Sequence, residues 1–514
     1  PTGYVSLCTE NLSESAYASI PDGSTAFDAI TYEGTGSNRS ITGLNMSPDF
    51  LWIKARTSYQ GGNQDHALFD NVRGTGKQLR LPSTNAETSN NYGVTAFNSD
   101  GFSLHGSFSG PTNGSHAGTA TEYVAWAWDA GDDANPTSIS AGSLNSSAYD
   151  QSQTWSTYGS ASSGGYASGL GIARGFNGDL STQVEGDTTG AYFSIPFSTT
   201  IASGDVGFVS YASSGDGRMK LYNGSSEVDD VGSSGNSQFR YSTYAGAITE
   251  IRISRNGRAF EFAAVSVFGK ILVDSNQTPP NKPSIPSDLR ANQSTGFSII
   301  SYTGNNTSGA TVGHGLNKRP DFIIAKSRDT SQNWLVFHSS FGASYHSDLN
   351  FTGGFFSGGS KWTSTEPTSS MFSIATDGAI NASGIDYIAY AWTAVEGYSA
   401  FGSYTGNGSS DGPFVYTGFR PRFLLFKCSS AIGNWIIIDS ARDTFNDGET
   451  AKLAPNHSYE ENNSSYIGFA SQTLVDFTSN GFKLRSTGGT SNDSGATYIW
   501  AAFCEHPFKT ARAR

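Results

Sequence analysis

Short apolar runs closed by polar turn residues recur along the whole chain. Three of these runs share one pattern, with a proline at the entrance, an apolar stretch and a lysine at the exit. They span residues 48–54, 320–326 and 421–427. Each stretch is too short for an ordinary helix and is bounded by a turn, so the pattern predicts a buried strand.

Four further features surround each run in the same order along the chain. A tyrosine–glycine pair precedes it, and a second apolar run, an Asp-Gly or Asn-Gly turn and an aromatic closing strand follow it. The tyrosine–glycine pairs begin at Tyr32, Tyr302 and Tyr404, and the second apolar runs begin at His66, Trp334 and Trp435. The turns begin at Asp100, Asp377 and Asn480, and the closing strands begin at Tyr123, Tyr387 and Tyr498. Asp-Gly and Asn-Gly supply the positive φ angles of tight hairpin turns. Features that recur in a fixed order predict three copies of one fold.

This pattern predicts an all-β fold of tandem antiparallel β-sandwich domains, jelly-roll-like in form, three of which are internal repeats. A chain this long is too large for one hydrophobic core and is expected to divide. The predicted parts are 1–28 as the end of a preceding domain or a connector, 29–135 as repeat 1, 136–276 as a central sandwich, 277–296 as a proline-rich linker, 297–400 as repeat 2 and 401–514 as repeat 3. The start at Pro1, without an initiator methionine, indicates a fragment or a processed product.

Composition and charge narrow the range of functions that the chain could have. The chain is rich in glycine and aromatic residues, and its formal net charge is −13. It has no long basic run, so the electrostatic footprint of a nucleic-acid-binding protein is missing. No apolar run approaches the length of a membrane span. The cysteines Cys8, Cys428 and Cys504 make neither a disulfide scaffold nor a metal site; a bridge between Cys428 and Cys504 is geometrically open, but buried free thiols are expected.

The central segment lacks the repeat pattern and is expected to form a separate β-sandwich. Asn223-Gly224 and Asn256-Gly257 are hairpin turn signals within it. Its unassigned aromatic residues in or beside turns are Trp155, Tyr158, Tyr211, Tyr222 and Tyr241. Such rings either stack on sugar rings or belong to the ordinary aromatic core of a sandwich, and the sequence leaves both readings open. The repeat tryptophans Trp126, Trp128, Trp392 and Trp500 alternate along strands, so core is expected for at least half of them.

The repeated motifs carry a resemblance. Tyr-x-Gly, Pro-Asp-Phe-Leu-x-Ile-Lys, Phe-Asp, Asp-Gly-Phe and Tyr-Val-Ala-Trp-Ala-Trp together resemble a β-sandwich domain of tail fibres and other virion surface proteins of marine phages, especially cyanophages. Repeat 1 is the closest copy, and repeat 2 departs from it with His338 at the Asp position and Ala379 after Asp-Gly. Residues 176–179 and 268–274 are similar to a companion domain of the same proteins, loosely like discoidin-type carbohydrate-binding sandwiches. The resemblance covers nearly the whole chain after Ala29.

The resemblance implies a bacteriophage virion protein, a tail-fibre or adhesin segment for host attachment, placed on the tail or outer surface and made in the host cytoplasm. The implied partners are a host cell-surface glycan, other virion proteins and further copies of the chain, as a homo-oligomer with a trimer favoured. A purely structural capsid-decoration or filament coat protein is the first alternative. A polysaccharide-degrading tailspike is the second, but glycoside hydrolysis needs two carboxylates across a cleft, and no such pair recurs at a suggestive spacing. We therefore assign no catalytic residue and do not expect an enzyme.

The resemblance also implies a cation site in the central sandwich. Asn177, Asp179 and Thr182 look like the loop that binds a structural Ca²⁺ in discoidin-like modules. Calcium takes several hard oxygen ligands, which Asn, Asp, Thr and turn carbonyls supply. Asn177 stands at the usual first Asp position and removes one charge, and a plain Asx-type turn needs the same residues. Calcium and a simple turn therefore remain alternatives.

Overall fold

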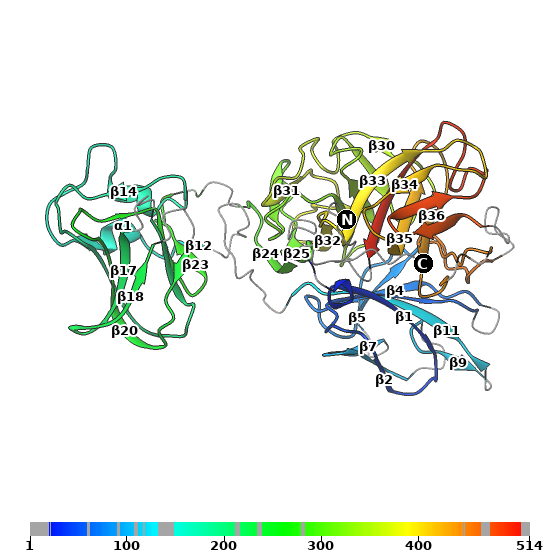
Figure 1. Ribbon diagram of the computed structural model, residues 1–514, viewed down its shortest axis with the longest axis horizontal. Helices are drawn as coiled ribbons and strands as arrows, with labels where there is room; N and C mark the ends of the chain where they lie inside the picture. The colour runs from blue at the N-terminus through cyan, green and yellow to red at the C-terminus, as the bar shows by residue number, and fades with distance from the viewer. Residues whose placement is uncertain are drawn as a thin grey trace, which may run out of the picture. The chain divides into compact units, whose positions relative to one another are not determined.

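The computed structural model describes residues 20, 22–58, 62–89, 93–106, 111–116, 119–131, 149–210, 216–233, 239–277, 279, 283–444, 446, 448–463 and 473–504. The chain divides into two compact units (Figure 1). Unit 1 consists of 1–136 with 288–514, and unit 2 consists of 137–287. Almost every element is a strand, as the all-β prediction requires. Among the described residues, no helix is long and apolar enough to cross a membrane.

Each repeat in unit 1 contains one large sheet. In repeat 1 its order is β1 (Phe27–Glu33), β11 (Glu122–Trp128), β3 (Phe50–Ala55), β4 (His66–Asp70), β5 (Lys77–Leu81) and β6 (Thr88–Ser89). In repeat 2 the order is β24 (Ser287–Asn292), β25 (Phe297–Thr303), β32 (Asp386–Trp392), β27 (Phe322–Ser327), β28 (Leu335–His338), β29 (Tyr345–Asp348) and β30 (Phe356–Ser357). In repeat 3 it is β33 (Ser399–Thr405), β39 (Thr497–Cys504), β35 (Pro421–Cys428) and β36 (Trp435–Asp439). The predicted strands β3, β27 and β35 therefore lie in the interior of their sheets, each between the closing strand and the second apolar run.

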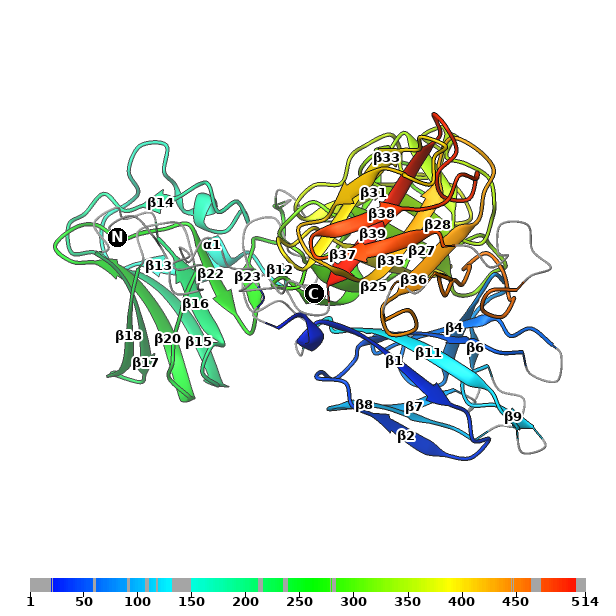
Figure 2. The ribbon, with the colours of Figure 1, turned by 45° about the vertical axis from the view of Figure 1, so that its right-hand side comes forward.

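A small second sheet completes each sandwich. The small sheets are β2 (Arg39–Thr42), β8 (Gly101–Leu104) and β7 (Val94–Asn98) in repeat 1; β26 (Ala310–Gly313) and β31 (Met371–Ile374) in repeat 2; and β34 (Phe414–Tyr416), β38 (Gly481–Leu484) and β37 (Val475–Thr478) in repeat 3. Repeat 1 also carries the short hairpin β9 (Ser115–His116) and β10 (Thr119–Ala120). In repeat 1, Ile41 and Phe102 of the small sheet share one core with Leu51 of the large sheet. The two sheets of repeat 1 face each other in Figure 2, with β1 and β11 above β7, β8 and β2. In repeat 3, Val415 and Phe482 of the small sheet likewise share a core with Leu424 of the large one.

The other face of each large sheet packs into a second core that all three repeats share. Side chains alternate between the faces of a strand. In β3, Phe50 and Trp52 enter the shared core, whereas Leu51 and Ile53 face the small sheet of repeat 1. In β35, Phe423 and Leu425 do the same, whereas Leu424 and Phe426 face the core of repeat 3. Because both faces are buried, these strands read as apolar runs without the alternation of a half-exposed strand.

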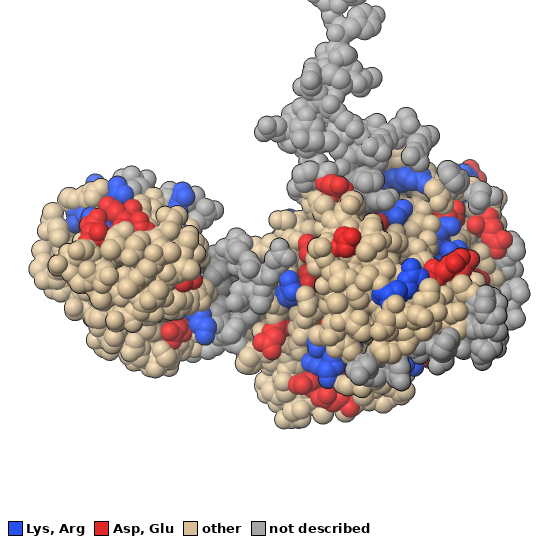
Figure 3. All heavy atoms as spheres, turned by 90° about the horizontal axis from the view of Figure 1, so that it is seen from below, with Lys and Arg blue, Asp and Glu red and all other residues tan. Residues whose placement is uncertain are grey.

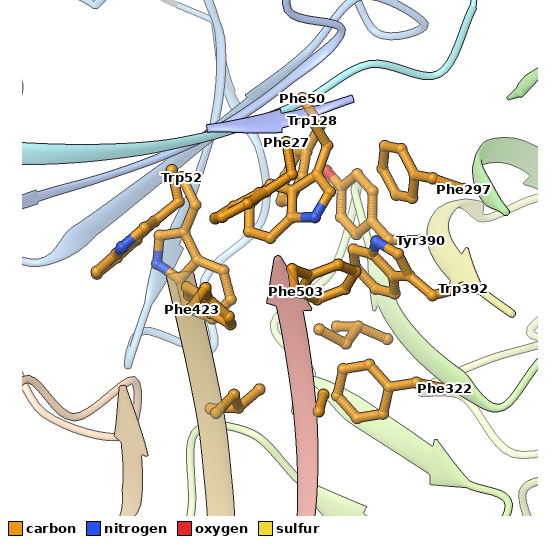
Figure 4. Close-up of a cluster of buried hydrophobic side chains, with 14 of the residues drawn as sticks. Phe27, Phe50, Trp52, Trp128, Phe297, Phe322, Tyr390, Trp392, Phe423 and Phe503 are labelled. Atoms are coloured by element: carbon orange, nitrogen blue, oxygen red, sulfur yellow. The ribbon is translucent and has the colours of Figure 1, made fainter. Parts of the chain in front are cut away.

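Equivalent residues of the three closing strands meet at the centre of the shared core (Figure 4). The ring centroids of Trp128 and Trp392 lie 6.1 Å apart, those of Trp128 and Phe503 5.6 Å, and those of Trp392 and Phe503 6.4 Å. The contacts form a closed triangle, so the repeats surround one core. This differs from a row of separate tandem sandwiches, in which each repeat would have only its own core. Aromatic residues on the outer faces of the large sheets are the reason, because a row of separate sandwiches would expose them.

Unit 2 is a separate sandwich. One sheet has the order β12 (Tyr149–Asp150), β23 (Lys270–Leu272), β22 (Ala264–Val267), β16 (Val206–Val209) and β19 (Arg240–Tyr241). The other has the order β13 (Ser160–Ala161), β15 (Phe193–Ile201), β20 (Gly246–Arg255), β17 (Gly217–Asn223) and β18 (Ser226–Gly232). The pair β14 (Val184–Glu185) and β21 (Glu261–Phe262) and the short helix α1 (Trp155–Tyr158) flank them. Both predicted Asn-Gly turns are present, with positive φ at Gly224 and Gly257.

Candidate functional site

The repeated aspartates are buried at junctions between repeats. Asp70 of repeat 1 pairs with Arg73, with Nε 2.5 Å from Oδ2, and accepts a hydrogen bond from the Tyr390 hydroxyl of repeat 2 at 2.7 Å. Asp439 of repeat 3 pairs with Arg442 at 2.6 Å and accepts a hydrogen bond from Trp126 Nε1 of repeat 1 at 2.9 Å. Burial on this scale requires a charge to be paired and hydrogen-bonded. The second-run aspartates therefore hold repeats together and are sealed from any substrate.

A glutamate extends each of these networks across the junction. Glu87 bridges Arg73 and Arg328 of repeat 2 through contacts of 3.1 Å each. In the same way Glu461 bridges Arg442, at 2.8 Å, and Arg56 of repeat 1, at 3.0 Å. Burial raises the pKa of Glu87, but the hydrogen bonds and charges of Arg328 and Arg73 lower it by more, so this pKa lies below its usual value. Both glutamates are therefore ionised at neutral pH and bind two guanidinium groups each.

The junction between repeats 2 and 3 replaces this polar network with aromatic residues. Phe341 occupies the arginine position and stacks on Phe355 at 4.6 Å. His338 occupies the aspartate position, and its Nε2 lies 3.1 Å from the Trp500 carbonyl oxygen. Burial lowers the pKa of His338 to about 4, so the ring is neutral and donates this bond. Repeat 3 offers Ala501 where the other closing strands have Trp126 and Tyr390, so an aspartate here would lack its donor.

The tyrosine–glycine pairs belong to a buried motif with an asparagine that the sequence analysis missed. Each tyrosine stacks on the first tyrosine of its closing strand, at 5.3, 5.3 and 4.9 Å in repeats 1 to 3. A buried asparagine accepts from the backbone after each glycine, through Oδ1 at 2.9 to 3.0 Å. These asparagines are Asn113, Asn381 and Asn492. Their place shortly before each closing strand was the signal in the sequence, but asparagine is common throughout this chain and does not stand out.

Three lysines at the strand exits are also buried. Lys54 Nζ donates to the carbonyls of Ala55 and Ser458, the latter in repeat 3. Lys427 Nζ donates to the carbonyls of Cys428 and Thr352, the latter in repeat 2. Lys326 Nζ donates to two carbonyls within its own repeat. Burial lowers the pKa of Lys54 to about 7 and those of Lys326 and Lys427 to about 8.

The predicted aromatic residues of unit 2 do not converge on one site. Trp155 is buried and donates through Nε1 to the Asp150 carbonyl, so it belongs to the core. Tyr158 beside it is 47% exposed. Tyr241 lies on β19 and stacks on Phe239, and Tyr211 lies outside the described residues. All four repeat tryptophans are buried, which satisfies the expectation that at least half of them belong to the core.

Tyr222 lies on the outer face of the β15–β20–β17–β18 sheet, in the most developed polar and aromatic cluster of unit 2. The Arg252 guanidinium sits 3.9 Å from the Tyr222 ring centroid and 4.8 Å from that of Tyr192. Glu250 holds Arg252 through two bonds of 2.7 and 2.8 Å. Glu227 accepts from Lys220 at 2.9 Å and from the Tyr222 hydroxyl at 3.1 Å. We call Tyr192, Tyr222, Arg252, Glu250 and Lys220 the tyrosine–arginine face. It presents two rings and charged hydrogen-bonding groups, whereas the other face of these strands fills the core.

The predicted cation loop gathers oxygen atoms around one hydroxyl. Thr182 Oγ1 lies 3.0 Å from the Arg174 carbonyl, 2.9 Å from the Asp179 carbonyl and 3.2 Å from Asn177 Oδ1. A hydroxyl has one proton, so it donates to only one of these three acceptors. The arrangement is oxygen-rich, as a cation site requires, although Asn177 Nδ2 also donates to the Thr182 hydroxyl at 2.9 Å. However, the Asp179 carboxylate caps Ser181 N at 2.8 Å, so the cluster near Thr182 holds no carboxylate. In the described residues, no three His, Cys, Asp or Glu side chains are placed to hold a metal.

Most of the chain matches one known protein family. A family described as a domain of unknown function (DUF7483) matches residues 22–179 and 275–507. The chain belongs to the DUF7483 family. The matched ranges cover the described parts of all three repeats, and the interval 180–274 between them falls inside unit 2 of this DUF7483 chain.

Other comparisons add little to the DUF7483 assignment. No curated protein matches the chain. A solved structure described as a truncated AlyQ with CBM32 and alginate lyase domains is similar over 67% of this chain and 95% of that chain, with 11% sequence identity and a TM-score of 0.18. A TM-score this low carries no argument about fold or function.

Charged groups on the surface of this DUF7483 chain are sparse and mixed. On the face drawn in Figure 3, basic and acidic side chains are interspersed among uncharged ones on both units. Cys428 and Cys504 are buried and form no disulfide bond with each other, as expected, and Cys8 lies outside the described residues. The geometry therefore separates two roles. The repeated residues close unit 1, and the exposed aromatic and charged groups of unit 2 are available to a ligand.

Proposed function

We propose that the chain is a virion surface protein of a phage, in which the three repeats form a rigid scaffold and unit 2 binds glycans of the host surface. The observation that supports this proposal is the burial of the repeated motifs. The aspartates, lysines, tyrosines and closing-strand aromatics that recur are buried in the repeats and at their junctions. Because the repeated chemistry is used to hold the scaffold together, ligand binding falls to residues that do not recur.

The tyrosine–arginine face of unit 2 supports the glycan part of the proposal. Aromatic rings pack on the apolar faces of sugars, while charged and hydroxyl groups bond to sugar hydroxyls. Tyr192 and Tyr222 supply the rings, and Arg252, Glu250 and Lys220 supply donors and acceptors within a few ångströms. Arg252 pairs with Glu250, Lys220 with Glu227 and Arg218 with Asp230, so the charges on and beside this face cancel, which favours a neutral glycan over a polyanion.

A glycan array probed with the intact chain tests this proposal. We expect the wild-type chain to bind at least one neutral bacterial-surface glycan, and the double variant Tyr192→Ala, Tyr222→Ala to lose that signal. Tyr158→Ser is the matched control, because it removes an exposed ring of the same unit that contacts Trp155 and is not part of the tyrosine–arginine face. Binding that is lost in Tyr158→Ser but kept in the double variant would place the site beside Trp155 instead and contradict our assignment.

A coat protein that never touches a receptor is the second candidate. It is favoured by the shared core, which buries the outer faces of three sandwiches within one chain and so leaves less apolar surface for contact with further copies. Light scattering of the purified chain separates the candidates. A trimer supports a fibre, whereas a monomer that binds no arrayed glycan supports a coat protein held by other subunits.

A further inference from the structure

The outer face of the small sheet in repeat 3 carries two exposed aromatic residues. Phe414 is 48% exposed and Tyr416 is 67% exposed, and Val415 between them is buried. Alternation along β34 therefore points both rings away from the core. Exposed rings on a sheet face are unfavourable for solubility, so two of them at successive outward positions indicate a contact with a ligand or partner.

The other two repeats serve as internal controls for these positions. The buried cross-strand pairs Ile41–Phe102, Val312–Phe372 and Val415–Phe482 align the three small sheets. With this alignment, Ser40 and Thr42 of repeat 1 take the places of Phe414 and Tyr416. Thr311 and Gly313 take them in repeat 2. The fold of the repeat therefore does not need rings here, and repeat 3 alone carries them.

Glycines hold the two rings against the backbone. A Cβ atom at Gly481, the partner of Tyr416, would meet the Phe414 ring at 3.0 Å, so this ring lies over the glycine. A Cβ atom at Gly418 would lie 3.7 Å from the Tyr416 hydroxyl and 3.9 Å from its ring carbons. Each ring thus has one side toward glycine and the other toward solvent. This arrangement leaves the open ring faces available for stacking.

Charged pairs border the rings. Lys483, the cross-strand partner of Phe414, pairs with Asp411 at 2.7 Å. Arg485 pairs with Asp476, the cross-strand partner of Lys483. The two pairs cancel in charge, and their partly exposed groups can donate to and accept from hydroxyls.

We propose that this face of β34 and β38 is a second glycan-binding site, which stacks a neutral polysaccharide on Phe414 and Tyr416. A whole phenylalanine or tyrosine offers about 150–250 Å² of surface. Two half-exposed rings thus fall far below the roughly 800 Å² per partner of a stable protein interface. Their size and flatness suit sugar rings, and the balanced charge of the border suits a ligand without charge. The site is separate from the tyrosine–arginine face and does not depend on the function proposed for unit 2.

Affinity electrophoresis of the intact chain tests the proposal, with hydroxyethylcellulose, laminarin or galactomannan in the gel and alginate as the acidic comparison. The background variant Tyr192→Ala, Tyr222→Ala removes the unit 2 face, so failure of one site is distinguished from failure of the other. In this background we expect retardation by at least one neutral polysaccharide. Phe414→Ser with Tyr416→Thr, the residues of repeat 1, should weaken that binding at least about tenfold.

Two further variants sharpen the result. Ser40→Phe with Thr42→Tyr places the rings on repeat 1 and is expected to restore retardation to the Phe414→Ser, Tyr416→Thr chain. Tyr345→Ser removes an exposed ring elsewhere in unit 1 and should change nothing. Retardation of the background by none of the three neutral polysaccharides overturns the proposal. So does retardation that survives Phe414→Ser with Tyr416→Thr, because the ligand would then bind elsewhere, such as along the backbone edge of β34. An unchanged circular dichroism spectrum and melting temperature exclude misfolding as the cause of a loss.

Discussion

At the scale of single residues, the repeated polar side chains are structural partners between repeats. The aspartate of the second apolar run is present where a neighbouring repeat supplies Tyr390 or Trp126 as a donor, and it is absent where the neighbour supplies Ala501. The sequence alone shows the substitution by His338 but not its cause. The cause lies in a residue of another repeat, more than a hundred positions away, and only the closed arrangement brings the two together.

Breaking one of these ion pairs should be costly. We expect Asp70→Asn to lower the free energy of unfolding by about 3–5 kcal/mol, because Arg73 keeps a buried charge without its closest partner. Urea denaturation measures this loss. Asp411→Asn is the matched control, since this exposed partner of Lys483 should leave the unfolding midpoint unchanged. A loss below about 1 kcal/mol for Asp70→Asn would show that the pair does not hold the junction.

The buried lysines predict an unusual dependence on pH. Burial lowers the pKa of Lys54 to about 7 and those of Lys326 and Lys427 to about 8, whereas unfolded lysine titrates near about 10.4. Above these folded values the unfolded chain binds more protons than the folded chain, so stability rises with pH. The neutral amine keeps two N–H groups, one for each of its two carbonyls.

We therefore expect the free energy of unfolding to increase between about pH 7 and 8.5, by up to about 1.4 kcal/mol per pH unit for each neutral lysine. Ordinary tyrosines ionise above this window, whereas the thiols of the unfolded chain, with a pKa of about 8.5, begin to ionise at its upper end. Denaturant unfolding at several pH values within it measures the slope. Lys326→Met should make the slope shallower, and a wild-type stability that falls across the window would contradict the account.

At the scale of elements, the sequence predicted where the strands lie but not which parts of the chain pack against them. The apolar runs that became β3, β27 and β35 were found from their length and their flanking proline and lysine. The same runs fit a strand buried in a separate sandwich or in a shared core, and only the structure, which brings the outer faces of the three large sheets together, distinguishes the two. The candidate ligand residues were harder still, because a position beside a turn does not fix the direction of a side chain. Trp155 turned out to be core, while Tyr192 and Arg252 next to Tyr222 were missed.

The central strand of repeat 3 gives a direct test of the shared core. Phe423 contacts Phe27, Trp126 and Trp128 of repeat 1 at centroid distances of 5.7, 5.7 and 5.6 Å. We expect Phe423→Ala to cost about 3–5 kcal/mol, as a large-to-small change in a packed core. Thermal or urea unfolding provides the measurement, with the exposed Phe414→Ala as the control. A cost below about 1 kcal/mol would mean that the site collapses easily and does not hold the repeats together.

The loop around Thr182 gives a second test at this scale. If it holds calcium, added Ca²⁺ should raise the melting temperature of unit 2 and a chelator should lower it, because a ligand stabilises the state it binds. Asn177→Ala removes one of the oxygen ligands and should weaken the response. A melting temperature that is the same with calcium and with chelator identifies the loop as a plain Asx-type turn.

At the scale of the whole molecule, the chain builds a closed ring of three sandwiches and carries a fourth as an insertion between the first and second. Two junctions in the ring are held by equivalent ion-pair networks, and stacked phenylalanines replace the network at the third. The family match covers the described parts of the ring and leaves 180–274 of the insertion unmatched. The match also includes 137–179 and 275–287 of the insertion, so its boundaries do not coincide with those of unit 2.

The central claim is that the three repeats form one cooperative body, and differential scanning calorimetry of the intact chain tests it most directly. The account predicts one large transition for unit 1 and a separate, smaller one for unit 2. Trp128→Ala removes a ring from the centre of the shared core, at a cost of about 3–5 kcal/mol, and should move the whole of the large transition to lower temperature. Separate transitions for the individual repeats, with only that of repeat 1 moved by Trp128→Ala, would contradict it.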